Sequence, residues 1–237
     1  MTEPAPEQAV SGWEDYLEIF YAPSRVFARR GTRWGMPLLV LVIVSGVLIL
    51  GTMGLLTPLL ESDSQRVMAS KLQQMTPEQA DRVRQMSGKI GMFFPIFAIA
   101  TMAILPIIVG LLLWFAGKVV GAVQELGAAF MVAVFAMFPR ILSWAILGMQ
   151  AAILPEENLK GLASVTLSPA RFMDPANTSM GLIALGMRFD VFVIWSTILL
   201  AIGLKVTGKV SGQKAAIAAI LVWVAGSLQA LVQLIRG

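Results

Sequence analysis

Residues 35–60 read GMPLLVLVIVSGVLILGTMGLLTPLL, and this run contains no charged side chain. An α-helix needs about 20 consecutive, mostly apolar residues to cross the hydrocarbon core of a bilayer. The run is long enough to meet that requirement. We therefore predict a membrane-spanning helix at 36–56.

The composition of the whole chain agrees with a lipid environment. Of its 237 residues, 57% are hydrophobic and only 14% are charged, and the mean hydropathy is +0.77. A soluble domain typically has about 25% charged residues to cover its wetted surface. This chain cannot surround a core with a polar surface, so we expect lipid to be the solvent for much of it.

Further uncharged or nearly uncharged runs follow the first one. They predict four more spans, at 90–117, 126–154, 189–206 and 215–235. The predicted fold class is therefore all-α: a polytopic membrane helix bundle with five transmembrane helices, plus short interfacial helices. An odd number of spans places the two termini on opposite sides of the membrane.

The distribution of basic residues favours a cytoplasmic N-terminus. Lys and Arg are almost equally numerous on the two predicted sides of the membrane. On the N-terminal side, however, they crowd short stretches beside the ends of spans. The positive-inside rule gives most weight to cations in such positions.

Residues 1–35 predict an interfacial amphipathic region ahead of the membrane domain at 36–237. Ser11 followed by Glu14 has the capping-box pattern of a helix start. An apolar face then recurs at helical spacing, set against Glu14, Asp15 and Glu18 on the polar face. Its members are Trp13, Tyr16, Leu17 and Phe20.

A second short helix is predicted from Pro23. It places Arg25, Arg29 and Arg33 at successive i+4 steps beside the first span. Each Lys or Arg close to an anionic membrane surface contributes about 1 kcal/mol of attraction. Two compatible interpretations fit: these arginines bind lipid headgroups, or they only fix the topology.

Two longer connections separate the spans. An extramembrane helical hairpin is predicted at 61–88, because Thr76, Pro77 and Gln79 form a strong helix-start pattern. The connection 155–188 carries isolated apolar residues between its prolines. We expect that connection to be partly helical and to lie along the membrane interface.

Arg140 is a charged residue near the centre of a predicted span, and it directly follows Pro139. Burying an arginine at that depth costs ~2.5–3.5 kcal/mol on insertion scales. Pro139 predicts a helix break, which frees a backbone carbonyl about one turn earlier. Two roles fit Arg140: a structural partner of that carbonyl, or an anion or headgroup site inside the bundle.

Polar residues also stand at two other places in the predicted bundle. Asp190 opens the fourth span, where a carboxylate favours the helix N-terminus, so we expect it to cap that helix. Pairing with Arg140 is the alternative. In the fifth span, Gln229 and Gln233 lie one turn apart on a helix with a small-residue face. They predict helix packing, within the bundle or between copies of the chain.

The sequence has no pattern for catalysis or for cofactor binding. His and Cys are absent, which excludes a Ser-His triad and imidazole or thiolate metal ligands. Paired intramembrane carboxylates and a phosphate-binding loop are absent from the sequence as well. We predict that the protein is not an enzyme, has no catalytic or metal-binding residues and no cofactor, and binds no nucleic acid.

Several short motifs resemble the Yip1 domain family of five-span membrane proteins. They occur at 22–27 (APSRVF), 75–79 (MTPEQ), 138–139 (FP), 190–195 (DVFVIW), 202–205 (IGLK) and 214–215 (KA). The resemblance implies a bacterial-type member in the bacterial cytoplasmic (inner) membrane, with a cytoplasmic N-terminus. Eukaryotic members of the family are associated with Rab GTPases, early secretory traffic and membrane shaping.

Composition and resemblance together predict a non-enzymatic multi-pass membrane protein that organises or shapes the bilayer, or scaffolds partners. The expected partners are the lipid bilayer, including anionic lipids, and further copies of the chain or other membrane proteins. The alternative function is a small-molecule or lipid transporter or channel in which Arg140 lines a cavity.

Overall fold

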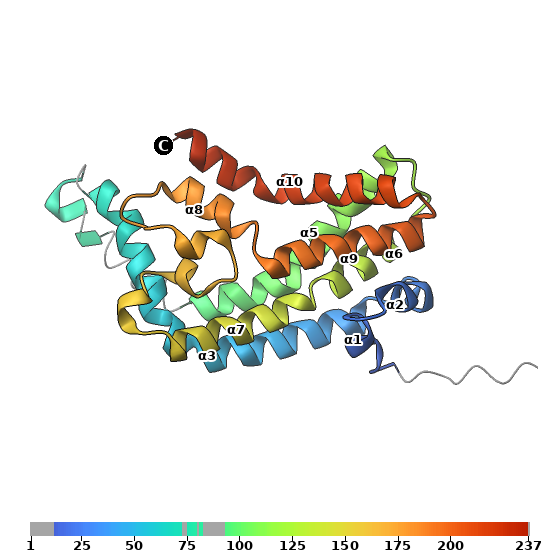
Figure 1. Cartoon of the computed structure of the whole chain (residues 1–237), viewed down its shortest axis with the longest axis horizontal. Coiled ribbons are helices and arrows are strands. Elements are labelled where there is room, and N and C mark those ends of the chain that lie inside the picture. The colour runs from blue at the N-terminus through green and yellow to red at the C-terminus, as the bar shows by residue number, and fades with distance from the viewer. Residues whose placement is uncertain (1–11, 73–74, 80, 83–92, 237) are drawn as a thin grey trace, which may run out of the picture.

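The computed structural model of the chain describes residues 12–72, 75–79, 81–82 and 93–236. Every regular element in these residues is helical. In chain order they are α1 (Asp15–Glu18), α2 (Pro23–Arg30), α3 (Gly35–Leu72), α5 (Phe94–Val119), α6 (Leu126–Ala136), α7 (Pro139–Ile153), the 3-10 helices η1 (Glu156–Asn158), η2 (Leu162–Val165) and η3 (Pro169–Phe172), α8 (Met180–Met187), α9 (Val191–Gly208) and α10 (Gly212–Arg236). Figure 1 shows α1 and α2 at one end of the elongated bundle, here called the near end, and α8 towards the opposite, far end.

Among the described residues, five helical segments are long and apolar enough to cross a membrane: α3, α5, α6 with α7, α9 and α10. Their apolar stretches have mean hydropathies between 1.9 and 2.7, and their outer faces expose many Ile, Leu, Val and Phe side chains. An apolar surface of this extent requires lipid rather than water around it. The predicted fold class is therefore confirmed. Residues 90–92 of the second predicted span lie outside the described residues.

The third span is broken at the predicted position. α6 ends at Ala136 and α7 begins at Pro139, which has no backbone N–H to donate. On both sides of the break the bonds are of the shorter i→i−3 kind: the N–H of Phe138 donates to Phe135 (3.2 Å) and that of Arg140 to Met137 (3.0 Å). Pro139 therefore separates two helices within a single membrane crossing.

The core of the bundle surrounds α6, where Ala128, Ala129 and residues 131–136 are buried. Small residues on the neighbouring helices permit close contact. A Cβ atom added to Gly110 of α5 would lie 2.5 Å from the Phe130 ring, and one added to Gly203 of α9 would lie 2.3 Å from Val132. α5 and α9 therefore press their backbones against the side chains of α6.

The first span continues beyond the predicted end of its membrane crossing. α3 runs as one helix from Gly35 to Leu72 and passes through Pro58, so the first arm of the predicted hairpin at 61–88 is a continuation of the span. Residues 61–72 contain no Gly or Pro that would end the helix. The N–H of Thr76 donates to Gln79 Oε1 (3.2 Å) and the N–H of Gln79 to Thr76 Oγ1 (3.4 Å), which is the predicted capping box. Residues 83–88 of the hairpin lie outside the described residues.

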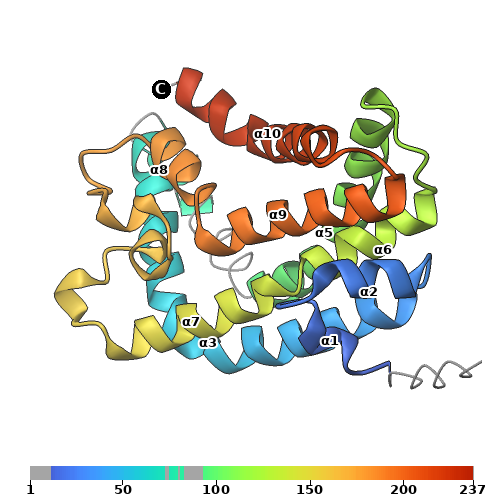
Figure 2. The same ribbon diagram turned by 45° about the vertical axis from the view of Figure 1, so that its right-hand side comes forward.

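Residues 155–188 form a far-end cap that contains the three 3-10 helices and α8, so this connection is partly helical as predicted. Figure 2 shows the cap between the end of α3 and α10. On the α3 side, Asp63 accepts the backbone N–H of Leu162 (2.8 Å), and Arg66 donates to the carbonyl oxygen of Lys160. On the other side α8 touches α10 closely, because a Cβ added to Gly181 would lie 2.3 Å from a backbone nitrogen of α10.

Candidate functional surfaces and intramembrane charges

The near-end helices are joined by a charge network that the sequence analysis did not anticipate. Asp15 is only 2% exposed and Glu18 only 7%, although both were placed on a polar face. The guanidinium of Arg29 donates to both carboxylates, and Arg30 donates to Asp15 and to the backbone carbonyl of Gly12. The hydrogen bonds to Asp15 and then to Glu18 raise the pKa of Arg29 above its ordinary value. The acidic side chains therefore hold α1 against α2.

Aromatic contacts attach this pair of helices to the bundle. The guanidinium carbon of Arg30 lies 5.9 Å from the ring centre of Tyr16 and 5.7 Å from that of Phe135 on α6. Tyr16 also stacks on Phe138, beside the break in the third span, with ring centres 5.4 Å apart. On the other side of the same turn, Phe20 meets the edge of Trp195 on α9. α1 and α2 are thus held against the spans on two sides.

The outward side of the near end combines apolar and basic side chains. Trp13, Leu17 and Tyr21 follow one another at four-residue steps and are 62%, 58% and 76% exposed. Arg25 is exposed, at 3.9 Å from Glu18, and Arg33 is exposed as well. We call these five residues the near-end surface.

The predicted stripe of Arg25, Arg29 and Arg33 along one helix forms only in part. α2 ends at Arg30, and the following Gly31 has φ 60°, so Arg33 lies beyond the helix. Arg29 is engaged by the buried carboxylates. Of the three candidates for headgroup binding, Arg33 is exposed, and Arg25 is exposed apart from its 3.9 Å ion pair with Glu18.

Arg140 lies at the second position of α7, half-buried inside the bundle. Its Nε is buried without a hydrogen-bond partner in the part of the chain that the structure describes. The carboxylate of Asp190 attracts it electrostatically, but the two side chains form no ion pair within those residues. The charge of the Arg140 guanidinium is thus only weakly compensated by the residues around it.

Asp190 caps the fourth span, as the sequence analysis favoured. Its Oδ1 accepts the backbone N–H of Phe192 at 2.9 Å, the usual geometry of a helix N-cap. Its Oδ2 accepts the N–H of Leu167 in the far-end cap at 3.0 Å. The same carboxylate therefore starts α9 and anchors the cap to it.

Arg188 is a half-buried cation whose role was not predicted from the sequence. Its Nε donates to Ser227 Oγ (3.0 Å) and its Nη2 to the carbonyl of Trp223 (3.3 Å), while the Trp223 indole N–H donates to the Arg188 carbonyl (3.1 Å). A Cβ on Gly226 would lie 2.8 Å from Arg188 Nη2, so this glycine leaves room for the guanidinium. The only signal in the sequence is the group Trp223, Gly226 and Ser227, which lies on one helical face.

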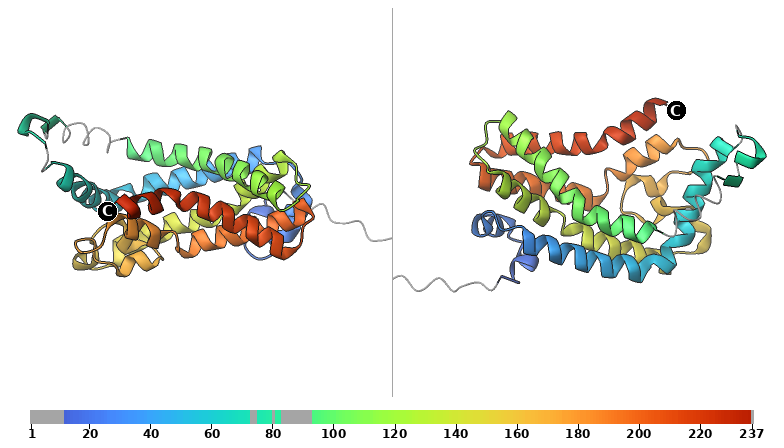
Figure 3. Two further views of the ribbon diagram at one scale, coloured as in Figure 1. Left: turned by 90° about the horizontal axis from the view of Figure 1, so that it is seen from above. Right: turned by 180° about the vertical axis from the view of Figure 1, so that it is seen from behind.

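Gln229 and Gln233 are exposed on α10, and neither makes a hydrogen bond to another described residue. The small residues of the same helix behave differently, because Ala215, Ala218 and Ala219 are buried. Figure 3 shows the cause: α10 lies close to α5 at the near end and diverges from it towards the far end. The alanines therefore pack within the bundle, and for the two amides the prediction of packing between copies stays open.

These features define an integral, multi-pass membrane protein with an all-helical bundle. The family model of the Yip1 domain matches residues 17–233, nearly the whole chain. The chain belongs to the Yip1 domain family. A search among curated proteins and a search among solved structures found no match.

Proposed function

We propose that this protein is a non-enzymatic organiser of the membrane, in which the near-end surface acts as a fixed wedge at the headgroup level of one leaflet. The observation that carries the proposal is that Trp13, Leu17 and Tyr21 remain exposed while α1 and its two flanking turns, which bear them, are tied to α2 and to the spans. An amphipathic segment typically buries its apolar face about 5–10 Å into the headgroup and acyl boundary. Because the near-end helices are attached to the spans, that insertion displaces lipid beside the bundle.

The basic members of the surface give the wedge a lipid preference. Arg25 and Arg33 are exposed at the start of the first span. Each contributes about 1 kcal/mol of attraction to an anionic surface, and salt weakens this attraction. We expect the wedge to act most strongly in membranes with anionic lipid, which are the proposed partner.

The experiment compares full-length protein and variants reconstituted in vesicles that contain anionic lipid, imaged to measure vesicle curvature. We expect the unmodified chain to produce smaller or tubulated vesicles, and the triple variant Trp13→Ala, Leu17→Ser, Tyr21→Ala to lose this effect. The matched control is Phe172→Ala, which removes an aromatic side chain that is 85% exposed at the far end. Equal curvature from the triple variant and the unmodified chain would reject the wedge.

The proposal includes an orientation, with the near end in the cytoplasm of a bacterial cell and the protein in its inner membrane. It is supported by the cations Arg33, Lys118, Lys205 and Lys214, which lie next to the ends of spans at the near end. Because the chain has no cysteine, a single introduced cysteine reports on which side of the membrane it lies. A membrane-impermeant maleimide should label Asn177→Cys in intact cells and Lys214→Cys only after permeabilisation. The reverse pattern contradicts the orientation.

A transport function is the second candidate, because the Nε of Arg140 is buried without a partner among the described residues. A permeating anion or headgroup would satisfy that donor. Release of a fluorescent anion trapped in proteoliposomes tests it. Flux that disappears in Arg140→Leu, with the fold intact, supports transport, and permeability equal to that of protein-free vesicles rejects it.

A further inference from the structure

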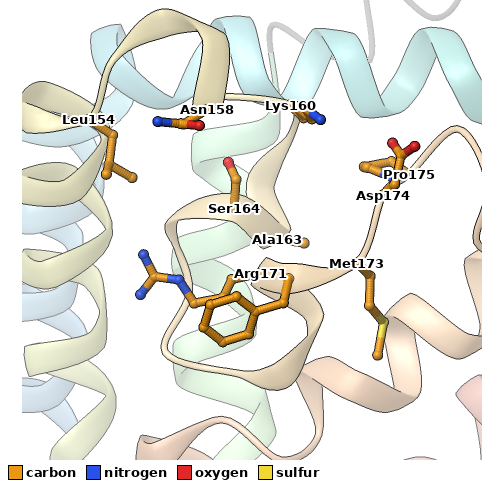
Figure 4. Close-up of a pocket in the computed structure, with 10 residues that line it drawn as sticks. Leu154, Asn158, Lys160, Ala163, Ser164, Arg171, Met173, Asp174 and Pro175 are labelled. Carbon is orange, nitrogen blue, oxygen red and sulfur yellow. The ribbon is translucent and has the colours of Figure 1, made fainter.

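The far-end cap contains a cavity of about 330 Å³ that no motif in the sequence pointed to. Ligand-binding cavities in proteins begin at about this size. Its walls come from the end of α7 and from the segments around η1, η2 and η3 (Figure 4). The lining residues are Leu154, Asn158, Lys160, Ala163, Ser164, Arg171, Phe172, Met173, Asp174 and Pro175.

The basic side chains of this cavity have no anionic partner in the described residues. Arg171 makes only a ring contact, with its guanidinium carbon 5.6 Å from the centre of Phe172, and neither it nor the Lys160 ammonium makes a hydrogen bond or ion pair there. Figure 4 places the Arg171 guanidinium on the side of Leu154 and Ser164, with Asn158 above. The guanidinium of Arg171 and the amide of Asn158 thus both line the cavity, whereas the Ser164 hydroxyl donates to the carbonyl oxygen of Gly161 (2.6 Å).

The acidic side chain of the cavity is already satisfied by its own turn. The Asp174 carboxylate accepts the N–H of Ala176 (3.2 Å) and the side-chain amide of Asn177 (2.6 Å). These bonds hold the pKa of Asp174 below its ordinary value, so the group stays ionised. Asp174 attracts Lys160 and Arg66 but forms no ion pair with either of them, and Arg171 makes no ion pair with a described residue.

The cavity lies next to the end of a candidate membrane crossing. Leu154 directly follows α7, the last helix of the third span. Ile153 at the end of that span and Phe172 beside Arg171 are both strongly exposed, as expected of side chains that face the membrane boundary. The cavity therefore adjoins a part of the surface where the membrane boundary is expected.

We propose that this cavity binds a phosphate group, with Arg171 as the principal contact, Asn158 as a further hydrogen-bonding group and Lys160 as a supporting charge. A phosphate offers several acceptor oxygens, which suit a guanidinium together with neutral donors. The apolar wall of Leu154, Phe172 and Met173 accommodates the carbon part of the ligand. A phospholipid headgroup of the far-side leaflet and a soluble phosphate ester share this chemistry.

The test measures binding of dioleoyl-phosphatidylglycerol to full-length protein in detergent by native mass spectrometry. Arg171→Gln should weaken binding about tenfold or more, because it removes a charge-assisted contact, and Lys160→Gln should weaken it less. Asp174→Asn should strengthen binding a few-fold, since it removes the negative charge of the cavity and keeps an acceptor oxygen for the turn. The matched control is Lys214→Gln, an exposed cation at the near end, which should change nothing.

Two further probes distinguish the sources of phosphate. Displacement of the lipid by millimolar inorganic phosphate indicates a site open to soluble phosphate esters, whereas lipid binding that phosphate does not compete for indicates a headgroup site. Dioleoylglycerol, which lacks the phosphate, should not bind. The proposal is overturned if Arg171→Gln retains full binding, if dioleoylglycerol binds equally well, or if Asp174→Asn weakens binding. The opposite signs expected for Arg171→Gln and Asp174→Asn separate lost binding from lost folding.

Discussion

The buried charge network of the near end makes Asp15→Asn the most informative substitution in this chain. Asp15 accepts hydrogen bonds from both Arg29 and Arg30 and is 2% exposed. Removing one partner of a buried ion pair typically costs about 3–5 kcal/mol. The side chain of Arg29 is 33% exposed and is partly rehydrated in the variant, and asparagine keeps one acceptor oxygen. We therefore expect a loss of about 2 kcal/mol, below the usual range.

This loss of free energy weakens the packing of α1 on α2, so it is measured at the amides of α1 and the turn that follows it. Amide hydrogen exchange of full-length protein in nanodiscs should show the amides of residues 15–22 exchanging about 30-fold faster, since each 1.4 kcal/mol is a factor of ten in the opening equilibrium. The control is Glu125→Gln, which removes an exposed carboxylate at the same end that caps no helix through its side chain. Unchanged protection of residues 15–22 in Asp15→Asn would show that the network does not hold α1 in place.

The remaining predictions concern the bundle and the cap. Arg140→Leu should preserve or raise the thermal stability in detergent, because it removes a charge whose Nε has no hydrogen-bond partner among the described residues. In the same melts, Arg188→Leu should lower the free energy of unfolding by about 2–3 kcal/mol, because its hydrogen bonds to α10 are lost. Gly181→Ala places a methyl group 2.3 Å from the α10 backbone and should cost about 1–3 kcal/mol, whereas Gly54→Ala, which meets nothing within 4 Å, should leave the melting temperature unchanged or higher. Because hydrogen bonds hold the pKa of Asp174 below its ordinary value of 3.8, the stability of its turn is fully present above pH 3.8 and is lost as the pH falls through the lower folded value, as an NMR titration would show.

The spans were predictable because the signal for a membrane crossing is local. A run without charges, such as 35–60, identifies a helix in lipid without knowledge of its neighbours. The break at Pro139 and the cap at Asp190 were predictable for the same reason, because each depends on a single residue type at one position. α3 continues beyond residue 60, past the predicted membrane crossing. There hydropathy no longer predicts the helix, and the absence of Gly and Pro is the remaining signal that it continues.

The charge network and the role of Arg188 were not predictable, because their partners are distant in the chain. Arg30 lies 15 residues from Asp15, and Arg188 lies 39 residues from Ser227. Helical periodicity contains no information about an arginine on another helix. It therefore places an acidic residue of an amphipathic helix on the solvated face, even where such an arginine binds it. The cavity could not be predicted from the sequence for the same reason, because its walls come from separate turns of the far-end cap.

The acidic residues explain how a chain with a net charge of only +4 presents basic surfaces at both ends. Asp15 and Glu18 join α1 to α2, Asp63 joins α3 to the far-end cap, Asp190 starts α9, and Asp174 closes its own turn. Each of these carboxylates is occupied by hydrogen bonds within the protein, and four of the five hold one element against another. Fewer acids are therefore left to compete for the exposed cations of the two ends. The proposed affinity of both ends for anionic headgroups therefore does not require a strongly basic sequence, and it depends on the same contacts that fold each end.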